Sequence, residues 1–335
     1  MSLLLQSDKI FVAGSRGMVG SAICRLLAKN GYTNENKRLL ISSHQELDLR
    51  DISKLDSWFS HNKPDIVICA AAKVGGILAN NSKPVDFLLE NLKIQNNLIE
   101  TSWKFGVKRF LFLGSSCIYP KEANQPIKEE YLLSGPLEAT NQWYAISKIA
   151  GLKLCEAYRR QYNFDAISLM PTNLYGPNDN YDLKESHVMA ALIRKFYEAK
   201  NSDANEVICW GSGKPLREFL FVDDFAEACL YCLRNWSPDS VDSPRDVLGH
   251  PLNWLNIGSG FEIEIKDLAE KISKITNYKG KIIWDKTKPD GTYRKKLCSK
   301  NINALGWAAS TDIEKGINLT LDYFENDLYQ GNLRF

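Results

Sequence analysis

The sequence lacks several features that define whole classes of protein. No uninterrupted apolar run reaches the roughly 18 residues that a membrane-spanning helix needs. Charges nearly cancel, with 42 Lys and Arg against 40 Asp and Glu, so a broad basic surface for nucleic acid is excluded. The apolar start Leu3-Leu4-Leu5 is too short for a secretory signal. We therefore expect a cytoplasmic protein that binds neither membrane nor nucleic acid.

Cysteine is present but sparse. The eight cysteines are spread over 335 residues, and most lie in apolar stretches, which is typical of buried free thiols in a reducing compartment. Cys229 and Cys232 form a CxxC, but no second pair or neighbouring histidine completes a zinc site. We expect neither a disulfide framework nor a bound metal.

The first half of the chain alternates short apolar runs with longer segments of helical spacing. The runs lie at 10–13, 39–41, 66–70 and 110–113, and the helical segments near 18–30, 51–61, 84–105 and 138–162. Continuous apolarity is typical of strands buried on both faces. The alternation predicts βαβ units, and hence an α/β fold with a doubly wound parallel sheet.

After Tyr175 the pattern changes, and the length of the chain leaves room for a second domain. Asp223 and Asp224 are placed to cap a helix that runs to about residue 235. Further elements are expected as a helix at 190–199, a turn at 210–213, a strand at 219–222, a surface loop at 236–251 and a strand at 255–258. We expect a dinucleotide-binding domain over 1–175, to which segments near 215–260 return, and a smaller α/β substrate domain over most of 176–335.

A glycine-rich loop lies between the first predicted strand and the first predicted helix. Its spacing, GxxGxxG, is a variant of the Rossmann fingerprint, in which glycines permit a tight turn and close approach of the backbone to a pyrophosphate. The helix that follows offers unpaired N–H groups to the phosphates. The predicted cofactor-binding residues are Gly14, Ser15, Arg16, Gly17, Met18, Val19 and Gly20.

The end of the second strand indicates which dinucleotide binds. An NAD enzyme usually places an acid there for the ribose 2′-hydroxyl, whereas this chain has Ser42-Ser43-His44. Arg16 is placed to pair with a 2′-phosphate instead, although a solvated surface arginine is the alternative. The sequence therefore favours NADP(H); the place of His44 in this site comes only from the family resemblance described below.

Tyr144 and Lys148 lie one helical turn apart on a predicted helix. A nearby ammonium lowers the pKa of a phenol, and such a tyrosine can protonate a carbonyl oxygen as hydride arrives at carbon. Ser115 follows the fourth strand, at the sheet edge where ligands bind, and its hydroxyl can hold the same oxygen. YxxxK also occurs by chance, but here it accompanies the glycine loop and Ser115.

These motifs resemble those of the extended short-chain dehydrogenase/reductases and, among them, the GDP-L-fucose synthase family. The resemblance covers nearly the whole chain. Its stretches are residues 16–22, 71–77, 112–120, 170–177, 186–188, 210–213, 217–219 and 288–292. The glycine loop and YxxxK mark only the superfamily, whereas Lys-Val-Gly-Gly, Ser-Ser-Cys-Ile-Tyr-Pro and Ser-His-Val are more specific.

The resemblance implies NADPH-dependent 3,5-epimerisation and 4-reduction of GDP-4-keto-6-deoxy-D-mannose to GDP-L-fucose by a homodimer. Cys117 and His187 match the base and acid that invert C3 and C5. Ser115, Tyr144 and Lys148 match the reductase residues. The matching cofactor contacts are Lys148, Pro171, Thr172, Asn173, Leu174 and His187, and the matching GDP-sugar contacts are Lys195, Trp210, Arg217 and Asp290.

The residues alone leave alternatives open. Without the resemblance, Cys117 is most simply a core thiol and His187 a surface residue at the start of a helix. Ser15, His44 and Lys195 depart from the family pattern, in which relatives often have His, Arg and Arg. Two further functions remain: another nucleotide-sugar epimerase or reductase of the superfamily, and a non-catalytic dinucleotide-binding protein on the same fold.

Overall fold

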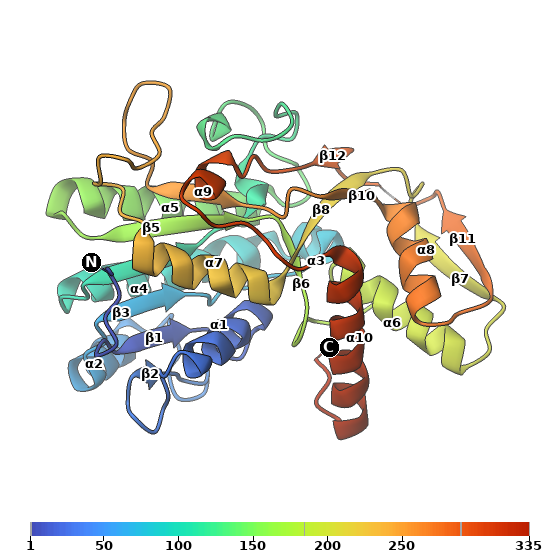
Figure 1. Cartoon of the computed structure of the whole chain (residues 1–335), viewed down its shortest axis with the longest axis horizontal. Coiled ribbons are helices and arrows are strands. Elements are labelled where there is room, and N and C mark those ends of the chain that lie inside the picture. Colours follow the sequence, from blue (N-terminus) through green and yellow to red (C-terminus); the bar gives the residue numbers. More distant parts are fainter. Residues whose placement is uncertain (1, 184, 289, 335) are drawn as a thin grey trace.

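A six-stranded parallel sheet forms the centre of the first half of the chain (Figure 1). The computed structural model describes residues 2–183, 185–288 and 290–334. The strand order is β2-β1-β3-β4-β5-β9. The bounds are β1 Ile10–Ala13, β2 Leu39–Leu40, β3 Ile66–Cys69, β4 Arg109–Leu113, β5 Ala166–Pro171 and β9 Trp254–Ile257. The prediction of a parallel sheet, including a late strand that returns to it, is confirmed.

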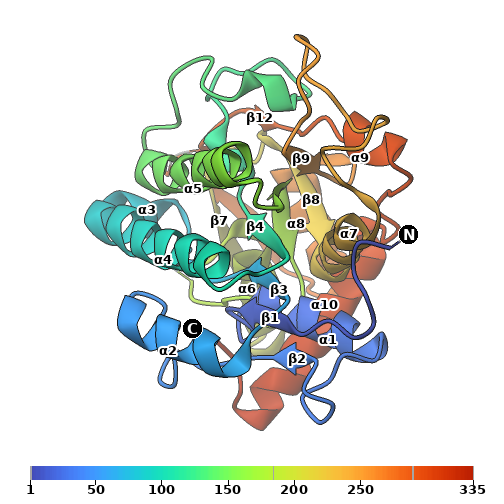
Figure 2. The same cartoon turned by 90° about the vertical axis from the view of Figure 1, so that its left-hand side faces the viewer.

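Helices cover both faces of the central sheet (Figure 2). Successive residues of each strand point to opposite faces, so each face supports its own core. Ile10 and Val12 pack with α1, α7 and α9, and Phe11 and Ala13 face the core built with α2, α4 and α5. The helix bounds are α1 Met18–Lys29, α2 Ile52–Asn62, α4 Asn91–Lys104, α5 Gln142–Tyr162, α7 Val222–Asn235 and α9 Lys300–Ala304. No helix in the described part of the chain is long and apolar enough to cross a membrane.

Short elements connect the strand ends of this sheet. Helix α3 (Ile77–Ser82) and the π-helix η1 (Asp86–Glu90) lead into α4. Two 3₁₀ helices follow β4, η2 (Ser116–Ile118) and η3 (Glu129–Tyr131). These connections lie on the side of the sheet where ligands bind in α/β folds.

A smaller body is built mainly from residues after β5, where the chain leaves the central sheet, and lies at the right of Figure 1. Strand β8 is paired with β6, β10 and β12, and β7 is paired with β11. The bounds are β6 Asn173–Tyr175, β7 Glu206–Trp210, β8 Leu216–Phe221, β10 Glu262–Glu264, β11 Lys281–Asp285, β12 Arg294–Lys295, α6 Val188–Asn201, α8 Ile265–Ile275 and α10 Ile313–Gln330. Its core joins α6, α8 and α10 through residues such as Phe196, Leu268 and Ile317.

One predicted cap is wrong. Helix α7 begins after Phe221, and no side chain caps it. Asp223 instead pairs with Arg25 at 2.6 Å. Asp224 is buried and accepts hydrogen bonds from the backbone N–H and hydroxyl groups of Ser310 and Thr311. Asp223 thus connects α7 to α1, and Asp224 connects α7 to the loop at 310–311. Both carboxylates bind these distant partners instead of the N–H groups at the start of α7.

Candidate active site

The glycine loop brings the start of α1 against the edge of the sheet. Gly14 has φ +86°, and a Cβ there would lie 2.6 Å from the backbone nitrogen of Ala71. A Cβ on Gly20 would lie 2.1 Å from the carbonyl oxygen of Gly14. Only glycine fits at both positions, and Gly17 precedes the first turn of α1. The loop therefore forms a cradle in which backbone N–H groups can approach a pyrophosphate.

Cationic side chains gather near the end of β2. His44 is largely exposed, and its Nε2 lies 3.8 Å from Asp48 Oδ1 and 3.4 Å from Arg50 Nη2. Arg50 also pairs with Asp48 at 2.8 Å. Arg16 lies near Glu46 and helps to lower the pKa of that carboxyl group. Arg50 was missed in the sequence, where it looks like an ordinary surface charge. Together with the glycine cradle, this corner fits NADP(H) and its 2′-phosphate.

Lys148 is buried on α5 beneath Tyr144. Its Nζ donates to the carbonyl oxygen of Leu113 at 2.8 Å and lies 5.8 Å from the centroid of the Tyr144 ring. Burial raises the pKa of Tyr144 above its usual value and lowers the pKa of Lys148. The sequence predicted that Lys148 lowers the pKa of Tyr144. In the structure this prediction is wrong, because desolvation of the phenolate raises the pKa. A phenol held protonated remains a proton donor.

Ser115 and Cys117 lie just beyond β4, beside Tyr144. The Ser115 hydroxyl oxygen accepts the backbone N–H of Cys117 at 3.3 Å and so caps η2. Burial raises the pKa of Cys117, whereas the charges of Lys295 and Lys148 and a hydrogen bond from Ser115 lower it. The charge of the Cys117 thiolate in turn raises the pKa of Tyr144. The structure thus brings together Ser115, Cys117, Tyr144 and Lys148.

His187 reaches the site from the smaller body. It is the N-cap residue of α6 and keeps solvent-exposed surface. Desolvation, followed by the charge of Lys295, lowers its pKa. A lowered pKa makes the imidazolium form of His187 a stronger acid, which suits a group that donates a proton.

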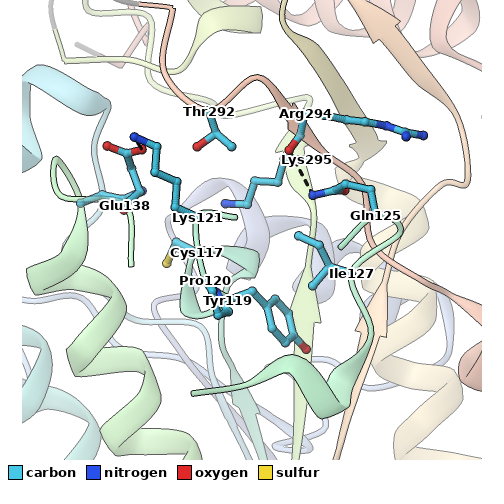
Figure 3. A pocket seen from close by; sticks show the side chains of 11 residues that line it. Cys117, Tyr119, Pro120, Lys121, Gln125, Ile127, Glu138, Thr292, Arg294 and Lys295 are labelled. Atoms are coloured by element: carbon cyan, nitrogen blue, oxygen red, sulfur yellow. Dashed lines mark hydrogen bonds and ion pairs between the residues drawn. The ribbon is translucent and has the colours of Figure 1, made fainter. Parts of the chain in front are cut away.

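Lys295 is a site residue that the sequence patterns did not reveal. It lines a cavity of about 30 Å³ together with Cys117, Glu138 and Thr292. Figure 3 shows its side chain reaching into this cavity beside Cys117. Strand β12 places it there by pairing with β8, which sets Lys295 opposite Arg217. Such a pairing leaves no signal in local spacing, so Lys295 was not identified from the sequence.

The four predicted GDP-sugar residues come together at one end of the smaller body. Lys195 Nζ lies 5.2 Å from the centroid of the Trp210 ring and donates to the Ile208 carbonyl at 2.9 Å. Arg217 Nη2 lies 3.4 Å from the Asp290 carbonyl oxygen, and burial lowers the pKa of Arg217. The position of Pro289, within the matched 288–292 stretch, is outside the described residues.

Two details of this group were not predicted. The Asp290 carboxylate accepts the backbone N–H and the hydroxyl of Ser212 at 2.6 and 2.7 Å, so its side chain fixes the turn after β7. Lys288 places a second ammonium near Trp210, 5.7 Å from the ring centroid. Lys195, Lys288 and Arg217 make this group cationic, as a diphosphate requires.

The segment Pro171–Leu174 links the central sheet to the smaller body. Pro171 ends β5, and Asn173 and Leu174 pair with Phe219 and Leu220 in β6 and β8. The side chains of Thr172 and Asn173 both donate to the carbonyl oxygen of Glu218, at 3.2 and 2.8 Å. These contacts fix the predicted cofactor segment against the residue that follows Arg217.

Comparison with known proteins agrees with this geometry. Residues 10–247 match the NAD dependent epimerase/dehydratase family. The chain belongs to this family. GDP-L-fucose synthase 1 of Arabidopsis thaliana is 52% identical over 95% of this chain and 94% of its own length. GDP-L-fucose synthase of Escherichia coli is 45% identical over 98% of this chain and 100% of its own length.

A solved structure supports the same placement within the family. A GDP-mannoheptose C4 reductase from Campylobacter jejuni with NADP bound has a TM-score of 0.84 and 33% identity. The match covers 96% of this chain and 99% of that one. The Rossmann-like fold and the membership of this enzyme family, both expected from the motifs, are confirmed.

Proposed function

We propose that this protein converts GDP-4-keto-6-deoxy-D-mannose to GDP-L-fucose with NADPH, by 3,5-epimerisation and then 4-reduction. Relatives named GDP-L-fucose synthase match nearly the full chain at about half identity. The observation that carries the proposal is the placement of Cys117 beside Ser115 and Tyr144. A reductase that leaves C3 and C5 unchanged has no use for a thiol at that point.

The epimerisation requires a base, an acid and a group that holds the enolate. The C–H bonds at C3 and C5 are acidic because both carbons are α to the C4 carbonyl. Cys117 removes the proton as its thiolate; burial raises the pKa of the thiol, and Lys295 and Ser115 oppose that rise. His187, on the other body of the protein, returns a proton to the opposite face. Ser115 and Tyr144 donate hydrogen bonds to O4 as negative charge develops there.

The reduction uses the same oxygen site. NADPH, held by the glycine loop, would supply the hydride for C4, and Tyr144 donates its proton to O4. The raised pKa of Tyr144 keeps this proton in place until the alkoxide develops. Arg217, Lys195 and Lys288 hold the diphosphate of the substrate, and Trp210 offers an apolar surface to the nucleotide sugar.

A single incubation tests this function. The protein is mixed with GDP-4-keto-6-deoxy-D-mannose and NADPH, and NADPH absorbance and the stereochemistry of the product are followed. We expect NADPH consumption and inversion at C3 and C5. Absence of NADPH consumption would overturn the proposal.

The C4 reductase from Campylobacter jejuni supplies the second candidate function, 4-reduction of a GDP-keto sugar without inversion. The same incubation separates the two functions. NADPH consumption with a product that keeps its C3 and C5 configuration would favour the reductase. Deuterium from D₂O at C3 and C5 of the product would favour the epimerase-reductase.

A second copy of the chain is the proposed partner, and the cytoplasm is the proposed location. Trp103, Ile146 and Tyr162 are exposed on α4 and α5, and the rings of Trp103 and Tyr162 lie 4.4 Å apart. An apolar surface on two adjacent helices suits a homodimer. All eight cysteines are free, in accord with a reducing compartment. Sedimentation of the protein and of Trp103→Glu tests the dimer, which we expect the substitution to dissociate.

A further inference from the structure

The turn after β3 approaches the segment before α6 more closely than any side chain would permit. The backbone N–H of Gly76 donates to the carbonyl oxygen of Glu185 at 2.7 Å. A Cβ on Gly76 would lie 2.6 Å from the Ser186 carbonyl oxygen and 3.1 Å from that of Glu185. Gly76 has a backbone conformation that any residue adopts. Glycine is therefore required here only because the carbonyl oxygens of Glu185 and Ser186 leave no room for a Cβ.

Two buried amides hold this turn on the first body. Asn80 Nδ2 donates to the carbonyl oxygens of Gly75 and Gly76 at 2.7 and 3.0 Å. At the other end, Asn91 Oδ1 accepts the N–H of Lys73 at 2.8 Å, and Asn91 Nδ2 donates to the Lys73 carbonyl at 3.0 Å. Both asparagines are at least nine-tenths buried. The turn is therefore a rigid support, because leaving either amide unpaired would carry the cost of burying a polar group.

The residues seated on this support immediately precede His187. Behind His187 the chain is fixed as well, because its carbonyl oxygen accepts the N–H of Ala191 at 3.0 Å in α6. Lys83, at the end of α3, adds an ion pair with Glu185 at 2.6 Å. The position of His187 relative to Ser115 and Tyr144 thus depends on a contact between the two bodies of the protein.

We propose that Gly76, held by Asn80, positions His187 for the return of the proton during epimerisation. The role of His187 as the acid rests on the proposed function, whereas the positioning of His187 by Gly76 does not. Gly76 and Asn80 are positioning residues, since neither is placed to touch the sugar. Hydride transfer uses Tyr144 and Ser115, which lie on α5 and after β4, so it does not depend on this contact.

Two substitutions disturb the contact in different ways. Gly76→Ala pushes residues 185–186 away, and Asn80→Asp replaces the donating amide with an acceptor. Two matched controls are Gly135→Ala, where a Cβ meets Pro120 at an ordinary 3.4 Å, and Asn81→Asp, which adds the same charge at an exposed neighbouring position. Thermal unfolding of each variant measures the loss of stability, and the milder Asn80→Asp remains informative if Gly76→Ala folds poorly.

The first readout is the product ratio with NADPH. Reduction before inversion gives a GDP-sugar that keeps its original configuration at C3 or C5. We expect both variants to lower the ratio of inverted to uninverted product by about tenfold or more, since small misplacements of a catalytic group are costly. The two controls should remain close to wild type in product ratio.

The second readout follows His187 directly by NMR, using His187→Gln to assign its signal among the four histidines. Desolvation and Lys295 lower the pKa of His187, so its displacement toward solvent should raise that pKa in both variants. A His187 signal and product ratio that match wild type, with only stability reduced, would overturn the positioning. A shifted signal with an unchanged ratio would instead support the positioning and contradict the acid role of His187.

Discussion

Lys295 and Cys117 face the same small cavity, although one lies on a late strand of the smaller body and the other follows β4 of the central sheet. Burial raises the pKa of the Cys117 thiol and lowers the pKa of the Lys295 ammonium, and the attraction between the two charged forms opposes both shifts. This pair is the electrostatic link between the fourth strand and the smaller body. It also makes the reactivity of Cys117 dependent on a residue of the smaller body.

Replacing Lys295 with methionine should therefore shift the reactivity of Cys117 to higher pH. The ammonium favours the thiolate, so its loss raises the thiol pKa, by about one unit or more for a close opposite charge. At a fixed neutral pH, less thiolate is then present. The rate of Cys117 alkylation as a function of pH measures this shift. The matched control is Lys296→Met, since Lys296 pairs instead with Glu262 at 3.7 Å. Equal profiles for wild type and Lys295→Met would contradict the coupling.

Cys117→Ser should slow deuterium exchange from solvent at C3 and C5 of the keto sugar by about 100-fold or more, because an alcohol is a far weaker base than a thiolate. NADPH binding should hardly change, since the glycine loop is untouched. NMR of the sugar in D₂O follows the exchange. Cys298→Ser, at a half-buried position, is the control. Exchange at the wild-type rate in Cys117→Ser would show that Cys117 is only a buried core residue and not the base.

His44→Arg should raise the preference for NADPH over NADH by about tenfold, the value of one additional charge-assisted hydrogen bond to the 2′-phosphate. His44 is exposed beside Arg50, so the larger side chain has room. The measurement is the ratio of kcat/KM for the two cofactors. His250→Arg introduces the same change at an exposed position in the 236–251 loop and should leave the ratio unaltered. An unchanged ratio in His44→Arg would count against a 2′-phosphate contact at this corner.

Asp223 and Asp224 are neighbours with very different expected contributions to stability. Asp224→Ala removes the buried acceptor of four hydrogen bonds from Ser310 and Thr311 and should cost about 3 kcal/mol of unfolding free energy. Asp223→Ala removes a partly exposed ion pair with Arg25 and should cost at most about 1 kcal/mol. Urea unfolding of both variants gives the difference. Similar losses would show that the 310–311 loop contributes little to the fold.

The sequence by itself determined those features that local spacing encodes. Strands buried on both faces appear as continuous apolar runs, so β1, β3 and β4 were found within a residue of their ends. The glycine loop was also predicted from the sequence. Gly14 and Gly20 are required by contacts within one strand–turn–helix unit and with the segment that follows the neighbouring strand. Tyr144 and Lys148 were found because one helical turn places them on the same face.

Only the tertiary structure decided which distant groups meet. Lys295 enters the site because β12 pairs with β8, and no spacing in the sequence records that pairing. Asp224 looked like a helix cap but binds a loop far along the chain, since the competing partners are absent from its local sequence. The contact between Gly76 and Ser186 is of the same kind. Local periodicity sets the elements, whereas the charges and positions that tune Cys117 and His187 arise only where the two bodies pack together.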